Sequence, residues 1–291
     1  MRVAAAPTWE PMEAPIGEIV RQSKSLAPFP RVALRVMELS TRPQVVPKDI
    51  IDVIQVDPGL TAKVLKLCNS AYYGFQREIA SIAEAGTRLG TETLANLVLT
   101  SCTGRYFRDY GGATGGSHDK LWKHCVANAI SARILAENAG IDRELAYTIG
   151  LLQNVGHLVL DRFVAAVRDA LAEEVERGST LLDAERRVLG MHHAELGARL
   201  LTRWGMPDVL VDTTRCHHTP LRARRDPLMC ATVHLAESLT WAVGITDSFG
   251  ELTHEVSAHA LDACATPKAG LAALVPRLEQ ELGRAGELLE I

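Results

Sequence analysis

The sequence has few aromatic residues and no excess of positive charge. Phe, Trp and Tyr make up 5% of its 291 residues, while hydrophobic residues make up 47%. The interior must therefore be built mainly from aliphatic side chains, which suits closely packed helices. A formal net charge of -4 at pH 7 lacks the basic footprint of a general nucleic-acid binder, so nucleic-acid binding is unsupported.

Several other missing sequence patterns indicate the fold class and the cellular compartment. No window alternates apolar and polar residues as a half-buried strand does, so we expect an all-α protein. The six cysteines include no Cys-x-x-Cys pair, which favours reduced, buried thiols over disulfides or a zinc–thiolate site. No apolar run is long enough to cross a bilayer, and Glu10 and Glu13 interrupt an N-terminus that is unlike a secretion signal. We expect a cytoplasmic protein without membrane contact.

Helix start and stop signals recur along the chain. A glycine-rich segment, 109–119, predicts a loop and the best boundary between two lobes. No Lys-Ser/Thr pair follows these glycines, which argues against a phosphate-binding loop. The predicted helices cover 31–41, 47–55, 58–68, 82–89, 91–107, 121–138, 143–152, 163–177, 193–204, 207–216, 227–243 and 268–289.

The segment from Gln55 to Gly74 is the most informative. Asp57 is a helix N-cap, and Pro58 fills the first helical position, where no amide donor is needed. Asn69 and Ser70 compete with the helical backbone for hydrogen bonds and favour the end of this helix. Two aromatic residues, Tyr72 and Tyr73, follow.

The amino-acid sequence of this segment closely resembles the core motif of the HDOD domain. HDOD domains are bacterial relatives of the HD-domain metal-dependent phosphohydrolases and are generally considered non-catalytic. The resemblance covers about residues 25–243, and it includes the cap at Ser81 and the stop signal Trp204–Pro207. It implies a helical bundle in two lobes, of which the C-terminal lobe resembles the HD fold. The expected parts are an N-terminal arm (1–24), an N-terminal lobe (25–115), an HD-like lobe (116–245) and a helical extension (246–291).

The same resemblance shows which residue of this sequence stands at each metal-ligand position of an HD enzyme. Those ligands are a His, an adjacent His-Asp pair and a later Asp, and they activate a bound water. His124 matches the first His, Gln153 and Asn154 replace the pair, and Glu237 stands at the last position. Amides do not ionise and suit divalent ions poorly, although they keep the volume of the lost ligands. We expect a degenerate site without catalysis, metal or cofactor.

Four other histidines match positions where HDOD sequences often carry histidine or lie beside the degenerate pair: His157, His193, His217 and His218. Together with His124 they could form a substitute metal site. The favoured interpretation is that each is a half-buried imidazole bonded to a backbone carbonyl or a helix end, because no pair has i, i+4 spacing within one motif.

Two exposed features have alternative interpretations. Arg222, Arg224 and Arg225 are candidate anion-binding residues, since guanidinium groups suit phosphate oxygens, but a solvated turn is favoured. Tyr72 and Tyr73 could face a partner protein, although packing between the lobes is favoured.

The resemblance implies a bacterial signalling or regulatory protein that acts through protein–protein contacts. Its partners would be other signalling or regulatory proteins, and self-association stays open. Two alternatives remain. One is a sensor that binds a nucleotide or another anion in the emptied cleft. The other is a residual metal-dependent phosphohydrolase that acts on a nucleotide through His124, His193, His217 and His218.

Overall fold

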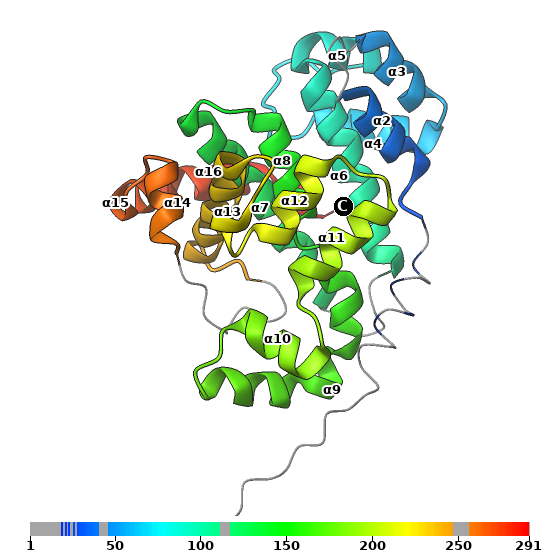
Figure 1. Ribbon diagram of the computed structural model, residues 1–291. Helices are drawn as coiled ribbons and strands as arrows, with labels where there is room; N and C mark the ends of the chain where they lie inside the picture. The colour runs from blue at the N-terminus through cyan, green and yellow to red at the C-terminus, as the bar shows by residue number, and fades with distance from the viewer. Residues whose placement is uncertain are drawn as a thin grey trace, which may run out of the picture.

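The computed structural model describes residues 28–40, 46–110, 117–246 and 256–290, together with Ile19, Arg21, Ser23 and Leu26. Every regular element within these ranges is a helix, which confirms the all-α prediction (Figure 1). None of these described helices combines the length and hydropathy that a membrane span requires. The helices are α2 (Arg31–Ser40), α3 (Pro47–Gln55), α4 (Pro58–Cys68), α5 (Ile82–Leu89), α6 (Thr91–Tyr110), α7 (Ser117–Ala139), α8 (Arg143–Leu152), α9 (His157–Glu176), α10 (Leu181–Leu189), α11 (His193–Arg203), α12 (Asp208–Cys216), the short 3-10 helix η1 (Pro220–Arg222), α13 (Pro227–Ala242), α14 (Ala258–Ala263), α15 (Lys268–Ala272), α16 (Val275–Arg284) and α17 (Gly286–Leu289).

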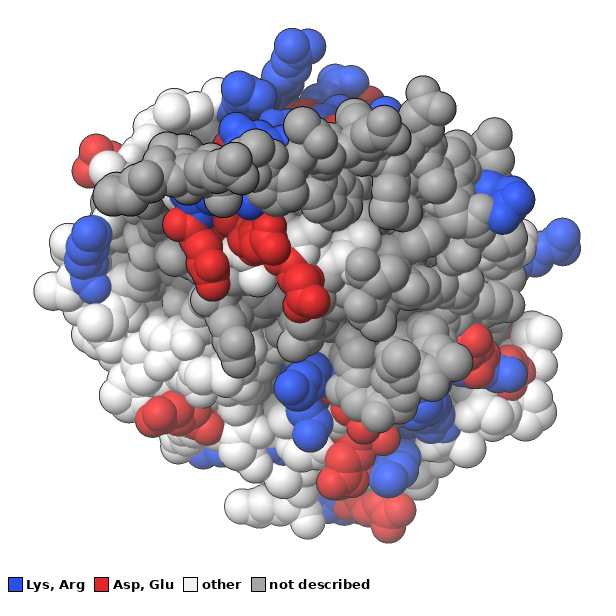
Figure 2. Space-filling view, turned by 90° about the horizontal axis from the view of Figure 1, so that it is seen from below, with Lys and Arg blue, Asp and Glu red and all other residues white. Residues whose placement is uncertain are grey.

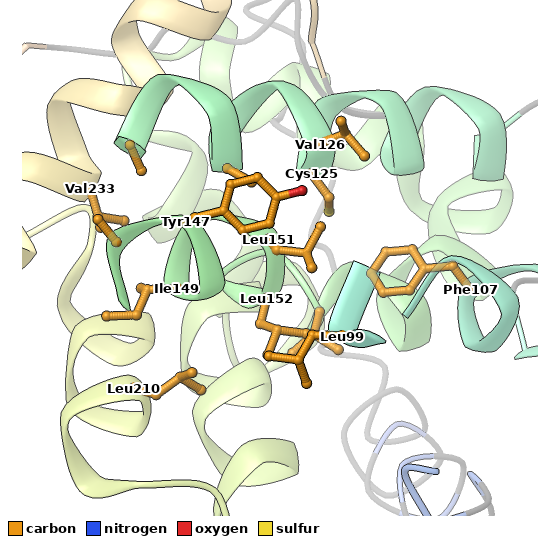
Figure 3. Close-up of a cluster of buried hydrophobic side chains, with 14 of the residues drawn as sticks. Leu99, Phe107, Cys125, Val126, Tyr147, Ile149, Leu151, Leu152, Leu210 and Val233 are labelled. Carbon is orange, nitrogen blue, oxygen red and sulfur yellow. The ribbon is translucent and has the colours of Figure 1, made fainter. Parts of the chain in front are cut away.

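The helices form two groups that α6 joins. Helices α2, α4 and α5 pack against α6, which in turn contacts α7 and α8. In the second group α7 is central and contacts α8, α13, α16 and α17 (Figure 1). Buried side chains from both groups form one continuous core. The close-up in Figure 3 shows where side chains of α6, α7 and α8 meet in it: Leu99, Phe107, Cys125, Val126, Tyr147 and Leu151.

Close contact between α7 and α8 depends on a glycine. A Cβ at Gly150 would lie only 2.7 Å from the carbonyl oxygen of Asn128. Real Cβ atoms do not approach a backbone oxygen so closely, so only glycine allows the two helices this separation. The contact brings the C-terminal end of α8 beside the buried face of α7.

The start of α4 follows its sequence signal. Asp57 Oδ1 accepts hydrogen bonds from the amides of Gly59 (2.9 Å) and Leu60 (3.0 Å), and Pro58 occupies the first turn. These bonds satisfy two of the amides that a helix start leaves without partners.

Asn69 joins the end of α4 to a segment ten residues later. Its Nδ2 donates to the carbonyl oxygens of Leu65 and Ile79, both at 3.0 Å. Its Oδ1 accepts from the amide of Ile79 at 2.7 Å. The side chain therefore replaces a short piece of backbone pairing and fixes the path of the chain from α4 toward α5.

Arg133 of α7 links the two helix groups. Its Nη2 donates to Glu144 Oε2 at 2.6 Å, and its Nη1 donates to the Tyr72 hydroxyl at 3.3 Å. The guanidinium carbon lies 4.3 Å from the centroid of the Tyr147 ring. Asn96 of α6 donates to the same carboxylate at 2.7 Å. Tyr72 thus contacts α7 of the other helix group. This contact agrees with the favoured interpretation, in which Tyr72 packs between the lobes.

Some predicted helix boundaries were wrong. Helix α9 begins at His157 rather than at residue 163, because a turn of only four residues separates it from α8. The predicted helix 268–289 is divided into α15, α16 and α17. Pro276 lies in the first turn of α16 and has no amide hydrogen with which to continue an earlier helix. Helices α10 and α14 were not predicted from the sequence.

Two predicted irregular segments lie mostly outside the described residues. The structure describes little of the arm, 1–24. In the glycine-rich loop, 109–119, α6 extends to Tyr110 and α7 begins at Ser117, so both ends of that prediction are helical. All six cysteines are free thiols, and five of them are buried, as the sequence predicted for most of them; Cys264 is partly exposed.

Replacement of Asn69 by Ala should lower the free energy of unfolding by roughly 1–3 kcal/mol, because the buried amide of Ile79 loses its partner. Thr87→Ala is the control, since Thr87 Oγ1 makes one exposed bond to the carbonyl oxygen of Ala83. That change should stay within about 0.5 kcal/mol. Urea denaturation of both variants measures the difference, and equal effects would contradict a joining role for Asn69.

Candidate functional site

The positions that resemble the HD ligands lie together in the interior. His124 lies on α7, Gln153 and Asn154 follow α8, and Glu237 lies on α13; each residue is 2% exposed or less. Asn154 Nδ2 donates to Glu237 Oε1 at 3.5 Å. His124 Nε2 lies 3.7 Å from the same oxygen. The fold therefore gathers His124, Asn154 and Glu237 at one point.

These side chains do not fit the metal centre of an HD phosphohydrolase. Asn128 Nδ2 donates to His124 Nε2 at 3.0 Å, and His124 Nδ1 lies 3.3 Å from the carbonyl oxygen of Ile245, so both ring nitrogens are engaged. Gln153 is fully buried, and its amide has no hydrogen-bond partner among the described residues. The amides that replace the His-Asp pair bring no charge to balance a divalent ion.

A second group of polar side chains borders the first. We call His157, His193, His217 and His218 the histidine cluster. The rings of His157 and His193 stack with centroids 4.2 Å apart, and those of His217 and His218 lie 4.0 Å apart. Glu237 Oε2 lies 3.5 Å from His218 Nδ1 and 3.9 Å from His217 Nε2. Glu237 therefore connects the cluster to the degenerate HD positions.

Three helix ends hold the histidine cluster in place. His157 begins α9, His193 begins α11, and His217 caps the C-terminal end of α12. His157, His193 and His217 are at most 1% exposed. The sequence predicted half-buried imidazoles, and these three are buried completely because three helix ends converge on them.

Hydrogen bonds orient two of the imidazoles. His193 Nδ1 lies 2.9 Å from Glu185 Oε2, and the same carboxylate oxygen accepts from the His193 amide at 2.8 Å. His217 Nδ1 donates to the carbonyl oxygen of Thr214 at 2.7 Å. In each ring the proton on Nδ1 leaves Nε2 with a lone pair. His193 Nε2 lies 2.8 Å from His218 Nε2.

Burial favours the neutral form of two adjacent imidazoles, His193 of the cluster and His192. Burial, followed by the neighbouring His157 and His217, lowers the pKa of His193 well below its usual value. The adjacent His192 caps α11, where its Nδ1 accepts from the amide of Glu195. Burial and then the positive Arg186 lower the pKa of His192 to about 4. At neutral pH His192 and His193 therefore serve as hydrogen-bonding groups rather than as cations.

A backbone contact sets the distance between the degenerate pair and the cluster. A Cβ at Gly156 would lie 2.0 Å from the carbonyl oxygen of His193. Only a residue without a Cβ allows the turn after α8 to touch the start of α11. This contact holds Asn154 and His193 within one buried region.

The arginine run lies on an exposed turn. The amides of Arg224 and Arg225 donate to Asp212 Oδ2 at 2.6 Å and 2.9 Å, and Arg225 Nη2 donates to Asp208 at 2.6 Å. Arg222 is also exposed. Since Asp212 holds the turn and Asp208 neutralises Arg225, this arrangement is that of a solvated turn, the interpretation that the sequence favoured.

Sequence reasoning missed Glu185 and Asn128, which orient His193 and His124. Glu185 had a signal: it lies beside Ala184 and four residues before Leu189, on the buried face of the amphipathic helix α10. A carboxylate on such a face requires a buried partner. Asn128 lies in a long apolar helix four residues after His124, where the two side chains meet on one face.

The sequence matches the family model described as the HDOD domain over residues 26–220. The chain belongs to the HDOD family. The prediction from the Gln55–Gly74 segment is thus confirmed. As an HDOD domain, the chain is related to the HD phosphohydrolases.

Each relative found by sequence aligns with only part of this chain, and this chain covers only part of each relative. An uncharacterized protein of Treponema pallidum (strain Nichols) is 30% identical over 201 residues, which are 65% of this chain and 37% of that protein. Ribonuclease Y of Aquifex aeolicus (strain VF5) is 28% identical over 110 residues, which are 37% of this chain and 15% of the enzyme. The chain therefore spans well under two thirds of the length of either relative.

Solved structures share the fold. An HDOD domain protein of unknown function from Geobacter sulfurreducens has a TM-score of 0.75 at 23% identity, with 94% of this chain and 99% of that chain covered. A Marinobacter aquaeolei VT8 protein, whose name suggests signal transduction, has a TM-score of 0.74 at 24% identity and coverages of 97% and 67%. A Shewanella amazonensis SB2B protein, whose name suggests a phosphohydrolase, has a TM-score of 0.71 at 23% identity and coverages of 94% and 97%. At these identities the likeness concerns the fold alone.

Replacement of Gly156 by Ala should lower the free energy of unfolding by about 3 kcal/mol or more, because the new methyl group would force α9 away from α11. Gly283→Ala is the control: it lies inside α16, and a Cβ added there would have no atom within 4 Å. That change should be neutral or stabilising by up to about 1 kcal/mol. Thermal and urea denaturation measure both variants, and a tolerated Gly156→Ala would disprove the close contact.

Proposed function

We propose that this HDOD protein is a non-catalytic signalling or regulatory protein of the bacterial cytoplasm. It acts by binding other signalling or regulatory proteins. The degenerate HD centre serves in this proposal as part of the structural core and performs no chemistry.

The burial of Gln153 and Asn154 is the observation that carries the proposal. Both residues are 0% exposed, and their amides stand where an active enzyme needs an imidazole and a carboxylate. Without an imidazole and a carboxylate at these positions, the region lacks the ligands that hold a divalent ion and activate a water in the HD manner. What the domain retains is its shape and its surface.

The two alternatives require an accessible cleft. A phosphohydrolase must admit the scissile phosphate to the metal, and a nucleotide sensor must admit the phosphate to cationic or donor groups. In the candidate cleft His124, Gln153 and His217 are fully buried, whereas 17% of the His218 side chain is exposed. This closed arrangement supports contacts at the surface over binding of a nucleotide in the interior.

The charge distribution supports protein partners over nucleic acid. The net charge is -4, and the described Lys, Arg, Asp and Glu side chains are intermixed on the face in Figure 2. A nucleic-acid interface uses a continuous basic surface. Mixed charges are suited to recognition between proteins.

The double variant Gln153→His/Asn154→Asp tests the assignment of the degenerate pair. The new carboxylate would face Glu237, and together with the new imidazole and His124 it would restore a ligand set, so Mn²⁺ should bind at least about tenfold more tightly than to the parent. Without metal the two buried carboxylates repel, and the melting temperature should fall until Mn²⁺ is added. Calorimetric titration and thermal melts measure both effects; unchanged Mn²⁺ affinity would mean that these residues do not share a site.

Hydrolysis assays on the parent decide the catalytic question. With bis-p-nitrophenyl phosphate and added Mn²⁺, Mg²⁺ or Zn²⁺, turnover should not exceed that of a protein-free blank. Metal-dependent turnover that Glu237→Gln abolishes would overturn the proposal. Capture of partners from cells of the source organism should give the same proteins with and without added nucleotide, whereas nucleotide-dependent capture would favour the sensor.

A further inference from the structure

We propose that the turn from Leu221 to Arg225, with Arg215 beside it, is a docking surface for an acidic segment of a partner protein. We call four exposed residues the arginine-rich surface: Arg215, Leu221, Arg222 and Arg224. The inference rests on the proposed function, because it gives a location and a chemistry to the protein contacts proposed there. In the free protein the turn is solvated, which leaves its side chains available to a partner.

Leu221 supplies the apolar part of this surface. It is 71% exposed, and the described residues include only two other large hydrophobic side chains that are exposed. The adjacent Pro220 is buried, and η1 packs against α12 and α13. The turn is therefore held against the body of the protein while the leucine side chain stays in water. A single exposed leucine needs no explanation, but this one lies among charged side chains that can hold a partner over it.

Three of the four arginines in and beside the turn have no ion-pair partner among the described residues. Of the four, Arg225 alone makes an ion pair there, with Asp208 at 2.6 Å. Arg215, Arg222 and Arg224 are exposed. The chain as a whole has a net charge of -4, so these guanidinium groups are a local exception. They would attract a partner that carries carboxylates.

The three arginines without ion pairs lie close enough to act on one buried group. Burial, and after it the Asp212 carboxylate, raises the pKa of the Cys216 thiol. The positive charges of Arg215, Arg222 and Arg224 oppose that rise. The three guanidinium groups therefore lie around the same end of α12, where one segment of a partner can reach them together.

Hydrogen bonds fix the backbone of the turn and occupy its carboxylates. A backbone bond of 2.8 Å closes η1. Asp212 Oδ2 accepts from the amides of Arg224 and Arg225 at 2.6 Å and 2.9 Å. Asp226 Oδ1 accepts from the amide of Met229 at 2.9 Å. The guanidinium donors thus stay available to a partner, and the preformed backbone reduces the entropy that binding costs.

The combination of charge and apolar area indicates a protein partner. Arginine is enriched at the centres of protein interfaces, and its guanidinium group makes paired hydrogen bonds with a carboxylate. A phosphate compound would use the arginines but would gain nothing from Leu221. Nucleic acid needs a longer basic surface than one turn provides. An acidic segment that also carries an apolar residue would use every side chain of the arginine-rich surface.

Peptide selection on the whole chain tests the proposal. A random peptide library displayed on phage is selected on the parent after removal of the phage that bind the variant Arg222→Gln/Arg224→Gln. The retained peptides should be acidic and should carry an apolar residue. A fluorescein-labelled synthetic copy of one should bind the parent, and its affinity should fall as NaCl is added. The double variant should bind it at least about tenfold more weakly, and Leu221→Ser about three- to tenfold more weakly.

A second double variant, Arg31→Gln/Arg284→Gln, is the matched control, since it removes two exposed arginines elsewhere. It should bind the peptide like the parent, and both double variants should melt like the parent because all four side chains are exposed. Selection of no acidic peptide, or equal weakening by the two double variants, would overturn the proposal. A single-stranded oligonucleotide that displaces the peptide would also overturn it, in favour of a phosphate ligand. The hydrolysis assay decides the non-catalytic assignment separately, so failure of this surface leaves that assignment standing.

Discussion

The structure depends on the burial of polar side chains where α7, α8, α11, α12 and α13 meet. A polar group removed from water must find a hydrogen-bond partner or lose its charge. His193 is bonded to Glu185, and His124 is bonded to Asn128 and to the carbonyl oxygen of Ile245. The bond of His193 to Glu185 ties α11 to α10, and the contact of His124 with Ile245 ties α7 to the segment after α13. Neither pair of elements can shift without breaking its contact.

The replacement of an ionisable pair by amides is consistent with this constraint. Gln153 and Asn154 occupy nearly the volume of His and Asp, so the helices around them keep their packing. They also remove the need to balance a buried charge. The close contact between Gly156 and His193 preserves the geometry of the turn. A core built in this way can keep its packing with amides at these two positions.

Much of the fold could be predicted because its signals are local. Asp57 and Pro58 fix the start of α4 through the nearest amides, and a resemblance in twenty residues identified the family. The start of α9 was not predictable from periodicity, because residues 151–160 are all buried and show no amphipathic pattern. Helix α10 was not predicted, although the N-cap residue Thr180 is a local signal for its start.

The site was only partly predictable, because its partners are distant in sequence. Alignment to the HD pattern found His124, Asn154 and Glu237, which the fold does bring together. Glu185 was missed, since the role of a buried carboxylate depends on a partner that the sequence does not identify. The pairing of His193 with His218 likewise arises only when α11 packs on α12.

Native-state hydrogen exchange tests the central claim that the degenerate HD centre is a closed part of the core. Amides in 155–160 and 194–201 lie around the turn at Gly156 and in α11. If the centre is closed, these amides exchange only through global unfolding, and their opening free energies equal the stability measured by urea denaturation. Exchange through local opening several kcal/mol below that value would show an accessible cleft and contradict the account.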